Sequence, residues 1–489
     1  MTTVVAVTVG YLLVCLTLGL IPARKSSGSV TGYVAGDRNM GLLLMYFITG
    51  ASIYSAFAFL GLPGWAYSQG AAAFYIPIYG LFALLPFYFL GPRAARVGRR
   101  YGIVTQADLL AQRFSMPSIA GVMALVSLVA FIPYLAIQIK GAGYVIYEVT
   151  DHAIPRELGG GLVYAVVAIY VLRSGVLGVG WTNTFQGIFM MVLAWGLGLY
   201  LPYKLCGGVG PMFEQLAETR PELLIPPGLN KDGGSWGWGE FSSAVLISTI
   251  GLIFWPHLFM KAFSAKDERT IRKTVVLYPS FQLFLVPLLF IGFAGIFMAG
   301  KPEEPDQILP YMLVNLDIAP ILVGLFCAGA LAASMSTGDA MAHAAGAIAV
   351  RDGMIRAGGV ELTADGEKRW IRIVIVVVLV LSYVVAVTYE GSLVTLLLTA
   401  YGGIVQFAPA ITAALYSRRV RGGAVLAGLI AGTLVTAYFI FLPDHRPWEI
   451  HAGVFGLIVN VAVIVVGSLG VREVQGSEFL AAASTRDGQ

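Results

Sequence analysis

The sequence has few charged residues for its length. Asp, Glu, Lys and Arg make up 12% of its 489 residues, whereas roughly 25% is usual in soluble domains. The hydrophobic share is 57% and the mean hydropathy is +0.79. A chain with so little charge cannot cover a large soluble surface, so we predict a polytopic membrane protein. The small net charge of +4 gives no reason to expect a nucleic-acid partner.

Cysteine and histidine are also scarce, with three and five residues in the whole chain. Cys15, Cys206 and Cys327 lie far apart in the sequence, so we expect neither a disulfide framework nor a metal cluster. The apolar segments contain scattered histidines and lack paired carboxylates, which leaves no candidate for a catalytic centre. We therefore expect that the protein is not an enzyme.

Long apolar runs are the main feature of the sequence. Runs of about 20 residues, enough to cross a core of ~30 Å as a helix, recur about thirteen times. The short alternating segments of a membrane β-barrel are absent. Residues 3–21 lack a basic flank and a small-residue cleavage site, so they resemble a first span rather than a signal peptide. We predict an all-α protein of about thirteen transmembrane helices.

The distribution of the 31 Lys and Arg residues predicts the orientation. Most of them fall in loops on one side of the membrane if the N-terminus is outside, and loops rich in Lys and Arg stay in the cytoplasm. With thirteen spans the C-terminus is then cytoplasmic. The expected parts are a first helix and loop (1–40), spans 2–6 (41–205), an external loop (206–238), spans 7–11 (239–420), spans 12–13 (421–472) and a mobile cytoplasmic tail (473–489).

Two of the expected spans are interrupted by residues that loosen a helix. Span 2, at about 41–66, contains Gly50-Ala51-Ser52 and then Gly61-Leu62-Pro63-Gly64. Span 7, at about 239–260, contains Trp255-Pro256-His257. The two spans are five apart and so cross the membrane in opposite directions. Paired broken helices in two halves predict an inverted-repeat transporter with its site at the midplane.

The ninth span contains hydroxyls and a carboxylate in the stretch Gly329–Asp339. On a helix, Ser336 and Thr337 lie one turn beyond the carbonyl of Ala333, so three oxygens converge. Small neighbouring residues allow another backbone to approach and to add oxygens, which suits a small hard cation without its water shell. The alternative is that these hydroxyls only hydrogen-bond the preceding turn or a neighbouring helix.

These motifs occur in an order that resembles the sodium:solute symporter family over essentially the whole chain. The resemblance implies a leucine-transporter-type core of two inverted five-helix repeats, spans 2–6 and 7–11. The matching segments are Gly32–Arg38, Gly50–Gly64, Trp181–Gln186, Trp255–His257, Ala333–Asp339 and Gln406–Pro409.

The resemblance also implies a bound sodium ion that joins the broken span 2 to span 9. Its ligands would be the carbonyls of Ala51, Tyr54 and Ala333 and the hydroxyls of Ser336 and Thr337. This sequence has Ile53 and Asn183 where some family members have acidic residues. The missing carboxylates favour one coupling ion over two and leave proton coupling through His257 or Asp339 open.

A substrate is expected beside the breaks, between spans 2, 4, 7 and 11. Amides freed at a broken helix favour an anionic group such as a carboxylate. Lys140 lies well inside span 4 and either faces an anion or snorkels to the outer interface. The candidate substrate residues are Ser52, Ile53, Ser55, Phe57, Tyr134, Gln138, Lys140, Trp255, His257, Tyr401 and Gln406.

The segments after the two breaks are most similar to the bacterial branch that handles monocarboxylates and pantothenate. We therefore expect sodium-coupled uptake of a small monocarboxylate, such as lactate or pyruvate, by alternating access in a bacterial inner membrane. Its partners would be the acid, sodium and the lipid bilayer. The alternatives are proton- or sodium-coupled uptake of pantothenate, proline or a sugar, and a solute-sensing module that works with a separate signalling partner.

Overall fold

The structure is a computed structural model that describes residues 2–21, 29–390, 393–471 and 476–484. Arg24 and Lys25 of the first loop lie outside the described residues. Within these ranges the regular structure is helical, apart from two isolated β-bridges in the connections. The prediction of an all-α membrane protein is confirmed.

The helices follow one another along the chain with short connections. Their bounds are α1 Thr2–Leu20, α2 Val30–Ala35, α3 Leu42–Ile53, α4 Leu62–Gln69, α5 Tyr75–Ala83, α6 Leu85–Tyr101, α7 Gln106–Phe114, α8 Pro117–Val149, α9 Arg156–Cys206, α10 Val209–Thr219, α11 Trp238–Gly251, α12 Pro256–Phe259, α13 Lys261–Ser264, α14 Glu268–Gln282, α15 Leu285–Gly295, α16 Ile308–Asn315, α17 Pro320–Ile348, α18 Ala364–Thr388, α19 Leu393–Ile404, α20 Phe407–Tyr416, α21 Gly422–Phe441, α22 Ala452–Gly467 and α23 Ser477–Ser484.

Nine helical segments of the described chain are long and apolar enough to cross a membrane, or ten if the bent pair around Trp255 counts as one span. Two of them, Phe57–Tyr101 with 45 residues and Arg156–Cys206 with 51, far exceed the length of one crossing. Each contains a glycine with a positive φ, Gly70 (φ 62°) and Gly175 (φ 58°), where the chain leaves the helical path. Both therefore fit the pairs of spans expected there. The total of thirteen stays a prediction.

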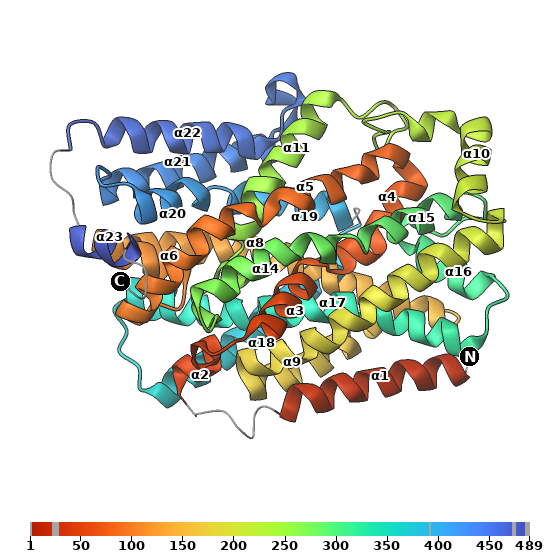
Figure 1. The fold of residues 1–489 in the computed structure, drawn as a ribbon, viewed down its shortest axis with the longest axis horizontal. Helices are drawn as coiled ribbons and strands as arrows, with labels where there is room; N and C mark the ends of the chain where they lie inside the picture. The colour runs from red at the N-terminus through yellow and green to blue at the C-terminus, as the bar shows by residue number, and fades with distance from the viewer. Residues whose placement is uncertain (1, 22–28, 391–392, 472–475, 485–489) are drawn as a thin grey trace.

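The two chain ends lie at opposite ends of the bundle (Figure 1). Arginines gather at the end that carries α2, α6 and α23. There Arg99 donates to the carbonyls of Ala265 and Lys266, at 3.3 and 3.1 Å. Arg93 donates to the carbonyl of Leu415 at 3.0 Å. We call this end the basic face. It is the end that the distribution of Lys and Arg predicts to be cytoplasmic.

The C-terminal residues contain a helix that their polar composition did not predict. Residues 477–484 form α23, and Phe479 stacks on Tyr101 of α6 with ring centroids 5.4 Å apart. The expected tail is thus partly packed against the bundle at the basic face.

Helix α17 is at the centre of the fold. Its most apolar window is 83% buried, more than in any other span of the described chain. It packs against α1, α3, α8, α9 and α18. Small residues make this possible: a Cβ added at Gly338 would lie 2.1 Å from the Tyr164 hydroxyl, so only glycine fits there. The surrounding helices can therefore approach the backbone of α17 closely.

Span 2 is interrupted where its sequence predicted. Helix α3 ends at Ile53, Tyr54 is extended (φ −90°, ψ 93°), and a short π-helix follows from Phe57 before α4. Side chains bind the two amides that follow the break: the Gln138 carbonyl accepts from the amide of Ala56 at 2.9 Å, and the Ser55 hydroxyl accepts from the amide of Phe57 at 3.2 Å. These two amides are therefore already occupied, and the expectation that amides at the break receive an anion stays a prediction.

A buried carboxylate lies at the end of the bundle opposite the basic face. One oxygen of Asp306 accepts a hydrogen bond from the Leu393 amide at the start of α19, at 3.0 Å. The other oxygen has no hydrogen-bond partner within the described chain and lies against Gly64. Burial raises the pKa of this carboxyl to about 6, above its ordinary value of 3.8. The neighbouring Glu304 raises the pKa further, whereas the Leu393 amide and Lys140 lower it.

We predict that Asp306→Asn reduces the pH dependence of stability. Because the folded protein holds this proton more tightly than the unfolded chain, stability falls as pH rises from about 4 through about 6, by about 3 kcal/mol in total. An asparagine can still accept from Leu393 and does not ionise. Thermal unfolding of detergent-purified protein between pH about 4 and about 7 measures the difference. Asp232→Asn, at an exposed loop residue, is the control, and a variant whose pH profile parallels the wild type would contradict the prediction.

Candidate ion and substrate site

The predicted sodium ligands of α17 lie against the end of α3. The Ser336 hydroxyl is 2.9 Å from the Ala51 carbonyl oxygen and 3.2 Å from that of Ala333. The Thr337 hydroxyl is 3.2 Å from the carbonyl oxygen of Ser52. All five residues are fully buried. Two hydroxyls and three carbonyls from two helices thus converge, immediately before the break in span 2.

This group of oxygens fits a small monovalent cation. The ligands are neutral oxygens, which hard cations prefer, and both hydroxyls now donate to carbonyls that an ion could take over. A site without formal charge binds weakly enough to release its ion. Tyr54 is placed differently: its ring lies against Phe284, and its hydroxyl donates to Tyr278 at 3.0 Å. The role predicted for the Tyr54 carbonyl stays a prediction.

Side chains of α9 hold the two halves of the ion site together. The Asn183 amide donates to the Ser336 carbonyl at 3.0 Å and to the Ser52 hydroxyl at 3.2 Å. Asp339 accepts hydrogen bonds from Tyr170, at 2.8 Å, and from Thr182, at 3.2 Å, through a single carboxylate oxygen. Asn183 therefore positions both sides of the site, a contact that the sequence did not reveal.

Aromatic side chains gather around the break in span 7. Helix α11 and the short segment after it bend by 49° there, and Trp255 adopts an extended ψ of 124°. Its ring centroid lies 4.8 Å from that of Tyr134, 5.6 Å from Tyr401 and 6.1 Å from His257. Phe131 of α8 completes the cluster at 6.0 Å. We call these five residues, from α8, the break, α12 and α19, the aromatic pocket.

The aromatic pocket contains several polar atoms without partners. The indole nitrogen of Trp255, the hydroxyl of Tyr401 and both ring nitrogens of His257 are buried, and none has a hydrogen bond to any described residue. Buried polar groups in proteins are nearly always hydrogen-bonded. Their concentration in one cluster makes it the candidate substrate site.

Two predicted substrate residues have partners elsewhere. The Lys140 ammonium lies 3.5 Å from a Glu304 oxygen and donates to the Tyr389 carbonyl at 3.1 Å, at the end of the bundle opposite the basic face. The Gln406 amide nitrogen donates to Thr436 and to the Gly453 carbonyl, both at 3.2 Å, towards α21 and α22. Lys140 thus faces a carboxylate of the chain itself, and neither residue belongs to the aromatic pocket.

The other candidates surround the break in span 2. Ser52 donates to the Ile48 carbonyl, and Gln138 joins the Ala56 amide to the Tyr134 carbonyl, from which it is 3.2 Å away. The remaining three, Ile53, Ser55 and Phe57, are buried at the same place. These residues shape the break and connect it to Tyr134 of the aromatic pocket.

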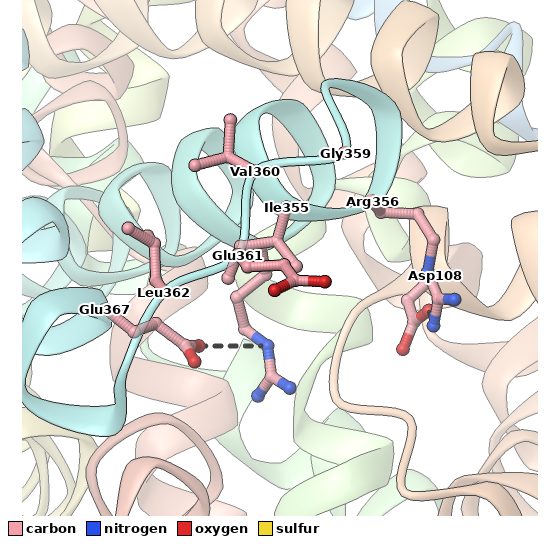
Figure 2. Close-up of a pocket in the computed structure, with 9 residues that line it drawn as sticks. Asp108, Ile355, Arg356, Gly359, Val360, Glu361, Leu362 and Glu367 are labelled. Atoms are coloured by element: carbon pink, nitrogen blue, oxygen red, sulfur yellow. Dashed lines mark hydrogen bonds and ion pairs between the residues drawn. The ribbon is translucent and has the colours of Figure 1, made fainter.

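A cavity of about 570 Å³ opens at the basic face but offers little to an anion (Figure 2). Its two arginines are already paired, Arg351 with Glu367 at 3.3 Å and Arg356 with Asp108. The cavity is lined by Asp108, Arg351, Ile355, Arg356, Gly359, Val360, Glu361, Leu362 and Glu367. These residues belong to α7, α18 and the segment between α17 and α18, away from both breaks.

Sequence analysis missed one charged residue of the interior. Lys261 of α13 is only 3% exposed, although it lies near a run of basic residues that starts at Lys266. A lysine next to such a run is expected to be solvent-exposed. The informative signal is the spacing of four between His257 and Lys261, which puts both on the same helical face inside the broken span.

The fold agrees with comparisons to known proteins. The sodium:solute symporter family model matches residues 33–432. The chain belongs to the sodium:solute symporter family. It is 28% identical over 483 residues to an uncharacterized symporter of Bacillus subtilis, covering 96% of this chain and 97% of that one.

Two further relatives have names that state a function. A monocarboxylate transport permease protein of Rhizobium johnstonii is 23% identical, covering 95% of this chain and 96% of its own. The sodium/pantothenate symporter of Escherichia coli is 26% identical, covering 94% and 95%. Among solved structures, a Na⁺-coupled sialic acid symporter in a substrate-bound outward-open state superposes with a TM-score of 0.78 at 17% identity, over 96% of this chain and 98% of that one. This likeness supports the leucine-transporter-type fold of a multi-pass transporter.

We predict that Ser336→Ala combined with Thr337→Ala weakens sodium binding. Loss of two oxygen ligands should raise the sodium concentration for half-maximal thermal stabilisation at least about tenfold, or ~1.4 kcal/mol. Sodium titrations of purified protein at constant ionic strength, with choline as the replacement, give this midpoint. The control is Thr184→Ala, because the Thr184 hydroxyl bonds only to the Gly180 carbonyl of its own helix among the described residues. An unchanged midpoint in the double variant would refute the assignment.

Proposed function

We propose that this protein is a secondary active transporter that takes up a small monocarboxylate, such as lactate or pyruvate, together with sodium by alternating access. One observation supports the proposal most directly. The hydroxyls of Ser336 and Thr337 donate hydrogen bonds to the carbonyls of Ala51 and Ser52 at the end of α3. An ion at this position binds the same broken helix that borders the substrate pocket.

A continuous set of contacts leads from the ion site to the aromatic pocket. Ala51 and Ser52 end α3, and the chain then passes through the break to Ala56, whose amide binds Gln138. Gln138 in turn holds the carbonyl of Tyr134, and the Tyr134 ring contacts Trp255. An ion that fixes the end of α3 therefore also favours one geometry of the pocket. Differential binding of this kind is what couples two ligands.

The unpartnered atoms of the aromatic pocket support a carboxylate as the substrate. The Trp255 indole, the Tyr401 hydroxyl and an imidazole N–H of His257 can each donate a hydrogen bond to a carboxylate oxygen. The aromatic rings offer apolar surface for a short carbon chain. The monocarboxylate permease of R. johnstonii gives independent support. The pantothenate symporter of E. coli makes pantothenate, another carboxylate, the second candidate.

The orientation proposed from the sequence puts the basic face in the cytoplasm of a bacterial cell. The N-terminus is then outside and the C-terminus inside. Substrate and sodium would enter from the end that carries Lys140 and Glu304 and leave at the basic face.

Uptake into proteoliposomes tests the proposed function. An imposed inward sodium gradient should make labelled lactate accumulate above its equilibrium level, and replacing sodium by choline should abolish the accumulation. Unlabelled pyruvate, pantothenate and proline, added as competitors, then rank the alternatives. Accumulation that is equal with and without sodium would contradict sodium coupling.

We predict that Trp255→Phe weakens substrate binding through loss of one donor. An aromatic ring remains, although it is smaller than the indole, so KM for the acid should rise at least about tenfold, the cost of about one hydrogen bond to a charged group. The sodium midpoint should change little. Trp195→Phe, at a half-exposed position on α9, is the matched control. A KM equal to that of the wild type would remove Trp255 from the list of substrate ligands.

A further inference from the structure

We propose that the groove between α3 and α14, next to the basic face, binds an anionic phospholipid, with an acyl chain in the groove and the phosphate at Arg269 and Lys273. This site is separate from the proposed ion and substrate sites. Its test requires neither sodium nor a transported acid.

The groove lies where α3 and α14 run side by side (Figure 1). Its volume is about 500 Å³. Leu43 on one helix is 59% exposed and Leu277 on the other is 44% exposed, and apolar surface of this kind on a membrane protein faces lipid. The groove is lined by Leu42, Leu43, Tyr46, Phe47, Leu277 and Ser280.

The lining suits a hydrocarbon chain better than a polar solute. Only two of its side chains, Tyr46 and Ser280, carry a polar atom. The Ser280 hydroxyl donates to the Leu277 carbonyl at 2.6 Å and accepts from the Tyr46 hydroxyl at 2.8 Å. Because these hydroxyls already have partners, the side-chain surface left for a ligand is aliphatic and aromatic. An acyl chain is the ligand of this chemistry that a bilayer supplies.

The groove begins at the basic face. Two backbone hydrogen bonds join the segments that precede α3 and α14. The Met40 amide donates to the Ser264 carbonyl at 3.0 Å, and the Lys266 amide donates to the Met40 carbonyl at 2.9 Å. Arg99 of the basic face donates to the carbonyls of Ala265 and Lys266 in the same segment. The first turns of α3 and α14 therefore lie together at this end of the bundle.

A row of basic residues on α14 leads into the groove. Arg269, Lys273 and Leu277 follow one another at intervals of four residues, or about 6 Å along the axis, so they share one helical face. Arg269 and Lys273 are exposed, and neither has a hydrogen bond or an ion pair with any described residue. A phosphate bound at Lys273 would thus have its acyl chain at the level of Leu277.

The carboxylates at the start of α14 have other roles. Asp267 caps the first turn of the helix, and Glu268 pairs with Arg96 at 3.0 Å. Arg269 and Lys273 therefore present positive charge that an anion can neutralise. Basic residues at the cytoplasmic ends of membrane helices attract anionic lipid, and the orientation proposed from the sequence puts this end in the cytoplasm.

A lipid in the groove would add contacts between two helices of the folded protein. Helices α3 and α14 already pack through Tyr46 and Phe281, whose ring centroids are 5.5 Å apart. A lipid that also touches both helices binds the folded arrangement and not the unfolded chain. It should therefore raise the thermal stability of the protein.

Thermal unfolding of the detergent-purified full chain, with added phospholipid, tests the site. Phosphatidylglycerol should raise the unfolding temperature in a saturable way, and phosphatidylcholine with the same acyl chains should raise it less. Arg269→Gln combined with Lys273→Gln should increase the phosphatidylglycerol concentration for half-maximal stabilisation at least about tenfold, because each basic residue near a membrane surface contributes about fivefold.

The matched control removes two charges elsewhere at the same end of the bundle. Arg418 and Arg419 are exposed in the connection between α20 and α21. Arg418→Gln combined with Arg419→Gln changes the net charge by the same amount and should leave the midpoint unchanged.

A second variant tests the acyl-chain part of the site. Leu277→Trp puts an indole into the groove and keeps both basic residues. It should raise the phosphatidylglycerol midpoint at least about fourfold, the effect of losing about one buried methylene. Leu381→Trp on α18, where the leucine is 46% exposed, is the control for an added indole on a lipid-facing helix.

Three results would overturn the proposal. The first is equal stabilisation by phosphatidylglycerol and phosphatidylcholine. The second is a midpoint that does not change in the Arg269 and Lys273 double variant, or that changes equally in the Arg418 and Arg419 control, since equal changes indicate diffuse attraction to the whole basic face. The third is wild-type binding by Leu277→Trp, which would place the lipid outside the groove. None of these results bears on sodium coupling, so the proposed function is tested separately.

Discussion

The structure depends on one constraint: a helix can be interrupted inside the apolar part of a membrane only where its freed backbone groups find partners. Helix α3 stops at Ile53, halfway through the bundle, and its partners come from two other helices. Gln138 of α8 binds the amide of Ala56 beyond the break. The hydroxyls of Ser336 and Thr337 on α17 bind the carbonyls before it.

These contacts explain why α17 is the most buried of the candidate membrane spans in the described chain. Its small residues let α3, α8 and α9 approach until side-chain hydroxyls reach neighbouring backbone. The carbonyls at the end of α3 are therefore satisfied by groups that can exchange a hydrogen bond for an ion. The geometry of the break in span 2 depends on the groups that hydrogen-bond to it. If an ion replaces one of these groups, the geometry can change, and the proposed ion site is linked to the aromatic pocket in this way.

Much of this arrangement could be predicted from the sequence. Proline and glycine identified both breaks, because these residues disrupt helices through local chemistry. The spacing of Ala333, Ser336 and Thr337 grouped three oxygens, because helical periodicity decides which residues share a face. The helical fold and the candidate ion-binding stretch both follow from such local rules.

Helical periodicity does not show which neighbouring helix packs against a given helical face. The sequence does not show whether Lys140 contacts a substrate or Glu304. It also does not show that Gln406 faces α21 and α22. Both contacts depend on the rotation of a helix about its axis, which packing determines. The burial of Lys261 was missed for the same reason, because it depends on how α13 packs against α6 and α2. The chain leaves the helical path of α9 at Gly175, where the positive φ follows from the local fit of the backbone and not from a pattern in the sequence.

The central claim is that ion and substrate bind to opposite sides of one broken helix and so favour each other. Reciprocal titration of the purified protein measures this coupling most directly, with acid affinity determined with and without sodium, and sodium affinity with and without the acid. The account predicts that each ligand tightens the other by the same factor, at least about fivefold. An acid affinity that does not change with sodium would contradict it.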